Sequence, residues 1–270
     1  MGTVWIERNG LAWEESSLLA AAGICHGVTG RSGGVSRAPW TSLNLSFDVG
    51  DQQLQVLENR RRLCQAIGTD VSSLTVARTV EGDHVTVVGE AERGCGAGSS
   101  ADGLPHTDAL VTNVPGIPLM VCAADSVPVI LADPVRQAVA VIHAGLRGTA
   151  AWITAKTVLA MELVYGSRPE QLVAYIGPAA AVPHLEVSEG VAASFAALGP
   201  AYASCIQQDH GRRLADSKGA NWQMLLDAGL RADHIDTSSA DTAGDSRFFS
   251  HRRDFGHTGR MAAFVMMRKD

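Results

Sequence analysis

Short runs of apolar residues, rich in Val, Ile and Ala, recur along the chain and predict β-strands. We expect strands at 74–80, 84–89, 108–112, 117–124, 127–133, 137–143, 172–177 and 261–267. Several of these runs lack the polar alternation of a half-exposed strand. Continuous apolar strands of this kind are typical of a sheet that is covered on both faces.

Apolar residues spaced three and four apart predict helices between these strands. The expected helices are 52–67, 149–165, 187–198 and 217–229. In 149–165, the residues expected to share the buried face are Trp152, Ala155, Leu159 and Leu163. Because helices alternate with strands but several strands are adjacent, we expect an α/β fold. The predicted architecture is a single domain, 1–270, with a mixed β-sheet flanked by helices in three layers.

Composition narrows the classes of protein that the chain can belong to. Hydrophobic residues make up 46% and charged residues 19%, which is ordinary for a soluble globular protein, and 270 residues can bury a substantial core. The formal net charge is −6, and the longest basic run is Arg60-Arg61-Arg62, so we expect no nucleic-acid partner. Without a long apolar stretch or the layout of a signal peptide at the start, we expect no membrane association and a cytoplasmic location.

The five cysteines are scattered at wide spacing without a C-x-x-C pair. This spacing argues against a disulfide framework and against a thiolate zinc finger. The sequence also lacks H-x-H, H-E-x-x-H and G-x-G-x-x-G. Any chemistry must therefore come from shorter signals.

The segment "VCAADSVPVILADP" (121–134) has polar residues inside an otherwise apolar run. Asp125 and Ser126 have two interpretations that the sequence leaves open. They either separate two strands, with Asp125 accepting backbone hydrogen bonds, or they bring polar groups to a site.

The segment "VIHAGLRG" (141–148) places His143 at a strand end and Arg147 in the turn before a helix. Turns of this kind collect ligands in α/β folds, because the N–H groups of the helix start attract anions. A histidine satisfied within the fold and an arginine facing solvent explain the segment equally well.

Three other segments carry polar or flexible residues. "TVEGDHV" (79–85) brings Glu81 and His84 to a turn that could equally be a surface hairpin, and "RGCGAGSSADG" (93–103) has the composition of a flexible loop. "FFSHRRDFGHTGR" (248–260) contains two histidines and three arginines, a cluster suited to phosphate or carboxylate. A solvated basic turn is the alternative.

Taken in order, seven motifs from about residue 26 to 267 resemble those of the YfiH-like family. These proteins are also called laccase-domain or polyphenol-oxidase proteins and are now described as purine nucleoside phosphorylases. The motifs are "GVTGRSGGVSRAPWTSLNLSFDVGD", "ENRRRL", "TDALVT", "AADSVPVILAD", "HAGLRG", "YIGPAAAVPHLEV" and "FFSHRRD…TGR".

The resemblance implies a zinc site whose ligands this sequence changes. Family members carry Q-x-H-G, A-D-C-x-P and H-A-G-W-R-G, in which His, Cys and His bind zinc. The matching positions here are Glu81, Ser126 and His143, and Leu146 replaces the tryptophan. Catalytic zinc requires three good protein ligands, and a neutral hydroxyl is a poor one. We expect the metal to depend on His143 and Glu81 alone, and zinc binding to be weak or absent.

Two functions follow from the resemblance and remain open. The first is phosphorolysis of adenosine, inosine or methylthioadenosine, with adenosine deamination in some members. It implies catalytic roles for His143, Glu81 and Ser126. Contacts to nucleoside and phosphate are expected from Arg31, Asn44, Arg147 and Arg253.

The second function is that of an inactive paralogue that binds a small molecule or a protein partner. Copper-dependent phenol oxidation follows only from a family name. Nine scattered histidines do not supply the paired ligands that such sites need, so we expect no copper.

Overall fold

A computed structural model describes residues 2–269 and contains two six-stranded sheets and a small hairpin. The first sheet has the order β1 (Thr3–Arg8), β2 (Leu11–Ser16), β3 (Cys25–Thr29), β14 (Met261–Met266), β7 (Leu119–Ala123), β4 (Thr75–Val76). The second has the order β13 (Ile235–Thr237), β10 (Val173–Ile176), β8 (Val127–Asp133), β9 (Ala138–Ala144), β6 (Ala109–Thr112), β5 (Val85–Val87). Both sheets are mixed, because most neighbouring strands are antiparallel and parallel pairs occur only at the sheet edges.

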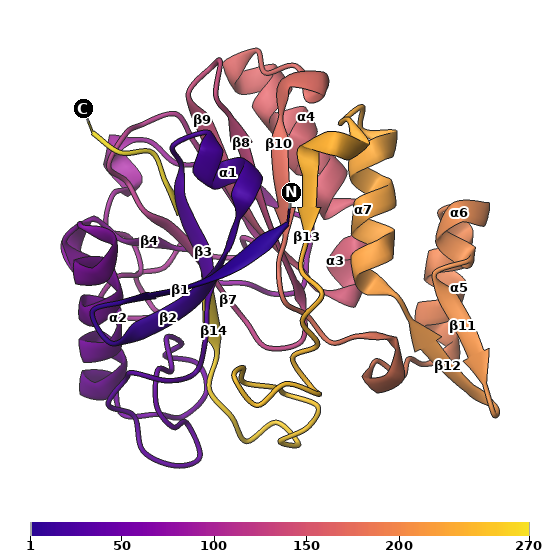
Figure 1. Cartoon of the computed structure of the whole chain (residues 1–270), viewed down its shortest axis with the longest axis horizontal. Coiled ribbons are helices and arrows are strands. Elements are labelled where there is room, and N and C mark those ends of the chain that lie inside the picture. Colours follow the sequence, from indigo (N-terminus) through magenta and orange to yellow (C-terminus); the bar gives the residue numbers. More distant parts are fainter. Residues whose placement is uncertain (1, 270) are drawn as a thin grey trace.

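Seven α-helices and five short 3₁₀ helices accompany the sheets in the described chain. The α-helices are α1 (Ser17–Ala21), α2 (Gln53–Ile67), α3 (Leu146–Ala150), α4 (Ile153–Tyr165), α5 (Glu189–Ala197), α6 (Pro200–Ala203) and α7 (Ser217–Asp227). The 3₁₀ helices are η1 (Val71–Ser73), η2 (Glu90–Glu92), η3 (Pro169–Gln171), η4 (Val182–His184) and η5 (Ala232–His234). The hairpin β11 (Ile206–Asp209) and β12 (Arg212–Ala215) extends to one side with α5 and α6 (Figure 1).

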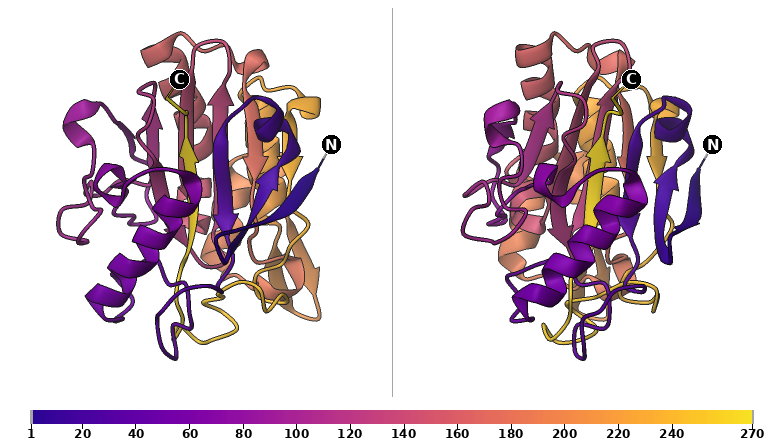
Figure 2. Two further views of the ribbon diagram at one scale, coloured as in Figure 1. Left: turned by 60° about the vertical axis from the view of Figure 1, so that its left-hand side comes forward. Right: turned by 90° about the vertical axis from the view of Figure 1, so that its left-hand side faces the viewer.

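The two sheets pack face to face, with helices on both outer sides (Figures 1 and 2). The central core joins apolar residues of β7 and β14 to residues of β8 and β9. A second core lies between the second sheet and α4, and a third lies between the first sheet and α2. The order of layers is therefore helix, sheet, sheet, helix.

The predicted α/β class with mixed strands flanked by helices is confirmed, but the structure has two sheets and four layers where we expected one sheet and three. Strand β7 shows why the pattern did not distinguish them. Leu119 and Val121 face the second sheet, whereas Met120 faces α2, and all three are fully buried. A strand that is covered by a sheet on one face and a helix on the other has the same continuous apolar pattern as a strand covered by helices on both faces.

The predicted buried face of helix α4 is wrong for Leu159 and Leu163, whereas Trp152 and Ala155 are half-buried against an apolar cluster of α5, α6 and α7. Leu159 and Leu163 are 49% and 75% exposed, whereas Ile153, Val158 and Met161 are buried against the second sheet. The chain turns sharply at Trp152, where φ is +67°, so that α3 and α4 are separate helices. Because α4 carries apolar residues on more than one side, the spacing alone did not decide which side is buried.

Strand register brings the polar segments of the sequence to one edge of the second sheet. Strands β8 and β9 are antiparallel, with Val127 opposite Ala144. The residue before β8, Ser126, and the end of β9, which carries His143, consequently lie at the same edge. No helix in residues 2–269 has the length and apolar character needed to cross a membrane.

Candidate active site

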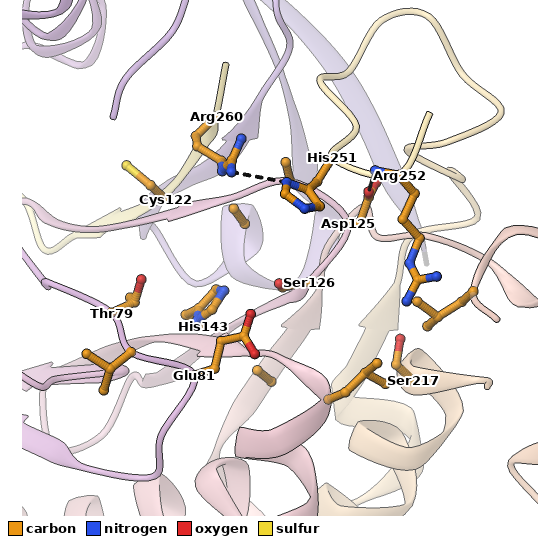
Figure 3. Close-up of a pocket in the computed structure, with 16 residues that line it drawn as sticks. Thr79, Glu81, Cys122, Asp125, Ser126, His143, Ser217, His251, Arg252 and Arg260 are labelled. Atoms are coloured by element: carbon orange, nitrogen blue, oxygen red, sulfur yellow. Dashed lines mark hydrogen bonds between the residues drawn. The ribbon is translucent and has the colours of Figure 1, made fainter. Parts of the chain in front are cut away.

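A cavity of about 330 Å³ opens at this sheet edge and contains the three residues at the changed zinc-ligand positions (Figure 3). Glu81 comes from the loop before β5, Ser126 from the start of β8, and His143 from the end of β9. The prediction that these residues, 45 and 17 positions from one another along the chain, converge in one cavity is confirmed. Their chemical roles remain proposals.

His143 is held in place by a buried carboxylate. Its Nδ1 lies 3.0 Å from Oδ1 of Asp108, and its backbone N–H donates to the Asp108 carbonyl at 2.7 Å. An ionised carboxylate accepts hydrogen bonds only, so Nδ1 must carry the proton. The other ring nitrogen, Nε2, is left for the cavity, where the ring lies (Figure 3).

Asp108 also shapes the turn that carries Glu81. Its carboxylate accepts the backbone N–H groups of Val80, Glu81 and Gly82 at 3.2, 3.0 and 2.8 Å. Burial alone raises the pKa of Asp108, but the bonds from His143 and from the backbone outweigh burial and place this pKa below its ordinary value. The side chain therefore remains an anion at neutral pH.

Glu81 adopts a left-handed conformation with φ of +57°, which is uncommon for a residue with a side chain. Two glycines of "HAGLRG" allow the turn to pack closely. A Cβ on Gly148 would lie 2.6 Å from the carbonyl oxygen of Gly82, and one on Gly145 would lie 3.5 Å from Glu81 Cγ and 3.7 Å from His143 Cε1. Glu81 and His143 therefore lie on either side of Gly145 at the cavity.

Asp125 lines the cavity but serves the fold. Its carboxylate accepts hydrogen bonds from the hydroxyls of Thr242 and Ser250 at 2.6 and 3.0 Å and from the N–H of Arg252 at 2.7 Å. Its own φ is +78°, and its carbonyl accepts the N–H of Ala180. Asp125 thus fixes the loop 250–252, as the first interpretation of the pair expects, and Ser126 lines the cavity.

The four residues expected to contact nucleoside or phosphate lie outside this cavity. Arg147 is exposed, and the guanidinium of Arg253 is occupied by the carbonyls of its own loop and by Asp254. Arg31 stacks on Phe249, with its carbon Cζ 4.8 Å from the ring centre, and donates to a backbone carbonyl.

Asn44 is fully buried and binds the fold. Its Oδ1 accepts the N–H of Arg260 at 3.0 Å, and its amide donates to Asp51 at 2.9 Å. Direct contact with a ligand in this cavity is therefore not available to it.

Instead, His251, Arg252 and Arg260 line the cavity (Figure 3). Nη2 of Arg260 lies 3.3 Å from Nδ1 of His251, and Arg252 donates to the carbonyl of Glu186 at 2.8 Å. All three residues belong to "FFSHRRDFGHTGR", the segment whose histidines and arginines indicated a site for phosphate or carboxylate. The loop geometry set by Asp125, which turns Arg252 toward the cavity and Arg253 into the loop, was not visible in it.

Two nearby side chains, His84 and Cys122, do not supply a substitute metal ligand. His84 is exposed and lies outside the cavity wall. Cys122 lines the cavity, but its sulfur is directed to the carbonyl of Leu45 at 3.5 Å. Burial raises the pKa of the Cys122 thiol despite the opposing charges of Arg60 and Arg260, so it is not a thiolate.

The residues present do not fit the zinc site that the resemblance implies. His143 Nε2 and the Glu81 carboxylate are two usable donors, and the third position is the neutral hydroxyl of Ser126. Within residues 2–269, no group of three or more His, Cys, Asp or Glu side chains is arranged to hold a metal ion. We therefore derive no chemical step through zinc.

The protein family described as "Multi-copper polyphenol oxidoreductase laccase" matches residues 25–268. The chain belongs to this YfiH-like family. The chain superposes on two solved structures with a TM-score of 0.92 and 32% identity in each case. They are described as "Crystal structure of YlmD from Geobacillus stearothermophilus" and "Crystal structure of Bacillus licheniformis hypothetical protein YfiH". Both comparisons cover 98% of this chain, and they cover 98% and 99% of the two relatives.

Among characterised sequences, the YfiH-like chain is 35% identical over 246 residues to "Purine nucleoside phosphorylase YlmD" of Bacillus subtilis. It is 37% identical over 240 residues to "Purine nucleoside phosphorylase" of Deinococcus radiodurans. These alignments cover 90% and 89% of this chain and 88% of each relative. The predicted family and fold are thus confirmed over nearly the whole chain.

Proposed function

We propose that the protein is a purine nucleoside phosphorylase, acting on adenosine, inosine or methylthioadenosine. The observation that carries the proposal is the cavity in which His143, oriented by a buried anion, faces Glu81 and the cationic side chains Arg252 and Arg260. The printed names of the relatives support the same reaction class.

The cavity offers a distinct partner for each part of a nucleoside and for phosphate. Leu146 and Leu185 give an apolar surface for the purine. The Glu81 carboxylate, exposed at the mouth, is an acceptor for ribose hydroxyl groups. Arg252 and Arg260 supply the positive charge that holds a phosphate dianion for attack.

In the proposed reaction, a phosphate oxygen forms a bond to C1′ of the ribose while the C1′–N9 bond breaks. The bonding electrons move to the purine, and protonated His143 donates its Nε2 proton to N7 of the departing base. Asp108 stabilises the imidazolium before transfer and keeps the proton on Nδ1 afterwards. Water then returns a proton to Nε2.

This route uses no metal, whereas deamination of adenosine needs an activated water. We therefore expect phosphorolysis of inosine to exceed deamination of adenosine. Arg147, exposed and outside the cavity, is no longer expected to be essential, and it provides a matched control for Arg252.

The test is incubation of the purified chain with inosine or adenosine and phosphate, followed by chromatography for free base and for inosine formed by deamination. Arg252→Ala should lower kcat/KM about tenfold or more by removing a charged contact, whereas Arg147→Ala should leave it within about twofold. Absence of base release above a control without enzyme would overturn the proposal. It would favour the paralogue that binds without catalysis.

A further inference from the structure

A second cavity of about 320 Å³ adjoins the first and is lined by three arginines. The two cavities share Thr79, Val80, Cys122 and Arg260 in their walls. Arg60 and Arg78 complete the basic lining, and the only carboxylate in it is that of Asp48. In a protein with a net charge of −6, this concentration of positive charge needs an explanation.

Arg60 is the buried arginine of the second cavity, since only 3% of its surface is exposed. Its guanidinium donates to the carbonyls of Leu45 at 2.8 Å and Ala97 at 3.2 Å, and its carbon Cζ lies 4.2 Å from the centre of the Phe47 ring. These neutral contacts fix the orientation of the guanidinium, and the exposed carboxylate of Asp48 only partly offsets its charge. A buried charge without a counter-ion is costly, which favours an anion in the space beside it.

The other two arginines are also free of carboxylate partners. Among residues 2–269, Arg60, Arg78 and Arg260 take part in no salt bridge. Arg260 donates to the carbonyls of Thr258 and Gly259, and Arg78 is exposed at the mouth. Asp48 is exposed as well and forms no salt bridge with Arg60, so it offsets only part of the positive charge at the buried end of the cavity.

The glycine-rich segment 93–103 forms one wall of this cavity. Gly96 has a φ of +81°, and a Cβ there would lie 2.9 Å from the Cα of Gly103, so the loop closes tightly on itself. The carbonyls of Gly96 and Ala97 bind Arg60, and Ser99 and Ser100 face the cavity. The hydroxyl of Ser99 donates to Asp102 at 3.0 Å, so the hydroxyl of Ser100 is the group in this wall that can donate to an anionic oxygen.

From these contacts, we propose that the second cavity is a subsite for a phosphoryl dianion, held by Arg60, Arg78 and Arg260. The inference rests on the proposed function only in linking this anion to the reaction in the first cavity through the shared Arg260. Free phosphate and the phosphate group of a larger ligand, such as ribose 1-phosphate or adenosine 5′-monophosphate, share the required chemistry.

The test measures binding without turnover. The purified full-length chain is titrated with inorganic phosphate, ribose 1-phosphate and adenosine 5′-monophosphate by calorimetry at constant ionic strength. Arg78→Ala removes an exposed side chain without a packing role and should weaken binding about five- to tenfold. Arg168→Ala, the same charge change at an exposed position outside both cavities, should have no effect, and Asp48→Asn should strengthen binding.

The outcomes separate this subsite from the proposed function. Binding of free phosphate that depends on Arg78 supports a subsite for a free phosphate ion, separate from the phosphate held by Arg252 in the first cavity. Binding of only the larger ligands supports a subsite for their phosphate group. If no ligand binds, or if the Arg78→Ala and Arg168→Ala variants bind the ligands with equal affinity, the subsite is overturned, even when base is released. Arg78-dependent binding without base release would support the subsite and contradict the phosphorylase.

Discussion

The carboxylate of Asp108 accepts three N–H groups from the turn 80–82 and one bond from the imidazole of His143. A single buried charge therefore orients both His143 and the turn that presents Glu81. The motif "TDALVT" did not indicate this role, because its pattern predicts only the start of a strand. Only the parallel pairing of β5 with β6 brings Asp108 beside the turn before β5.

We predict that Asp108→Asn lowers both activity and stability. An amide cannot accept all of these bonds, so the free energy of unfolding should fall by about 2 to 3 kcal/mol. Base release should fall about 10²-fold, because His143 loses the group that fixes its tautomer and stabilises its positive charge. Urea unfolding and the pH profile of kcat measure the two effects.

A control for this variant is Asp83→Asn in the same loop. Asp83 pairs with Lys156 at the surface, where such a pair contributes less than about 1 kcal/mol. Equal losses in the two variants would show that Asp108 has no special role. If Asp108→Asn lowers kcat by the same factor at every pH, the role of Asp108 is structural alone.

The changed zinc ligands lead to a second prediction at this scale. The natural chain should purify with far less than one zinc ion per chain, because it offers two good donors. The double change Glu81→His with Ser126→Cys should raise zinc content toward one ion per chain, since three donors would then surround the site. Histidine is among the residues that tolerate the left-handed backbone found at position 81.

Elemental analysis after dialysis measures this change independently of activity, with each single variant as a control. Stoichiometric zinc in the natural protein would contradict the prediction. It would show that Glu81 and a further ligand complete a site that the donor set does not indicate.

At the scale of elements, the two helical faces of α4 show what periodicity can and cannot give. The pattern correctly predicted a helix ending at residue 165, but apolar residues on more than one side of α4 left its buried face undecided. We predict that Leu163→Glu changes the free energy of unfolding by less than about 0.5 kcal/mol, because this side chain is 75% exposed. Met161→Ala, at a fully buried position, should cost about 2 to 5 kcal/mol. Comparable losses in thermal or urea unfolding would contradict the observed face.

Sequence reasoning succeeded for elements where apolar runs were long and failed where polar residues interrupt them. Strand β8 occupies the predicted range 127–133, and β9, β10 and β14 differ from prediction by one or two residues at their ends. The N-terminal strands β1 and β2 were missed, because "TVWIER" has charged, exposed residues at its end and "LAWEES" buries the polar residues Glu14 and Ser16 between the sheets. The directions of the Arg252 and Arg253 side chains could not be predicted either, because the carboxylate of Asp125, distant in the sequence, sets the loop that carries them.

At the scale of the whole molecule, the two sheets are joined by polar contacts as well as by the central core. The hydroxyl of Tyr175 on β10 donates to Glu14 on β2 at 2.7 Å, and the hydroxyl of Ser16 donates to Asp236 on β13 at 2.6 Å. His26 on β3 packs edge-to-face with Tyr175. These contacts tie the first sheet to the second at the side opposite β4 and β5.

His26 should make stability depend on pH. Its Nε2 accepts the N–H of Ser16 at 2.8 Å and its Nδ1 donates to the carbonyl of Ile24, so the folded state requires the neutral ring. Burial lowers the pKa of His26 below the ordinary 6.5, although its hydrogen bonds oppose this. Below pH 6.5 the unfolded chain therefore binds a proton that the folded chain does not, and stability falls as pH falls.

We predict that the free energy of unfolding decreases from about pH 6.5 downward, with a contribution from His26 of at most about 1.4 kcal/mol per pH unit. His26→Gln should be less stable at pH 7.5, because it disturbs the bonds to Ser16 and Ile24, yet its stability should vary less between pH 7 and pH 5.5. His210→Gln, at an exposed position, should keep the natural pH dependence. Urea unfolding at half-unit pH steps decides the matter, since equal slopes for the natural chain and His26→Gln would show that another group senses the protons.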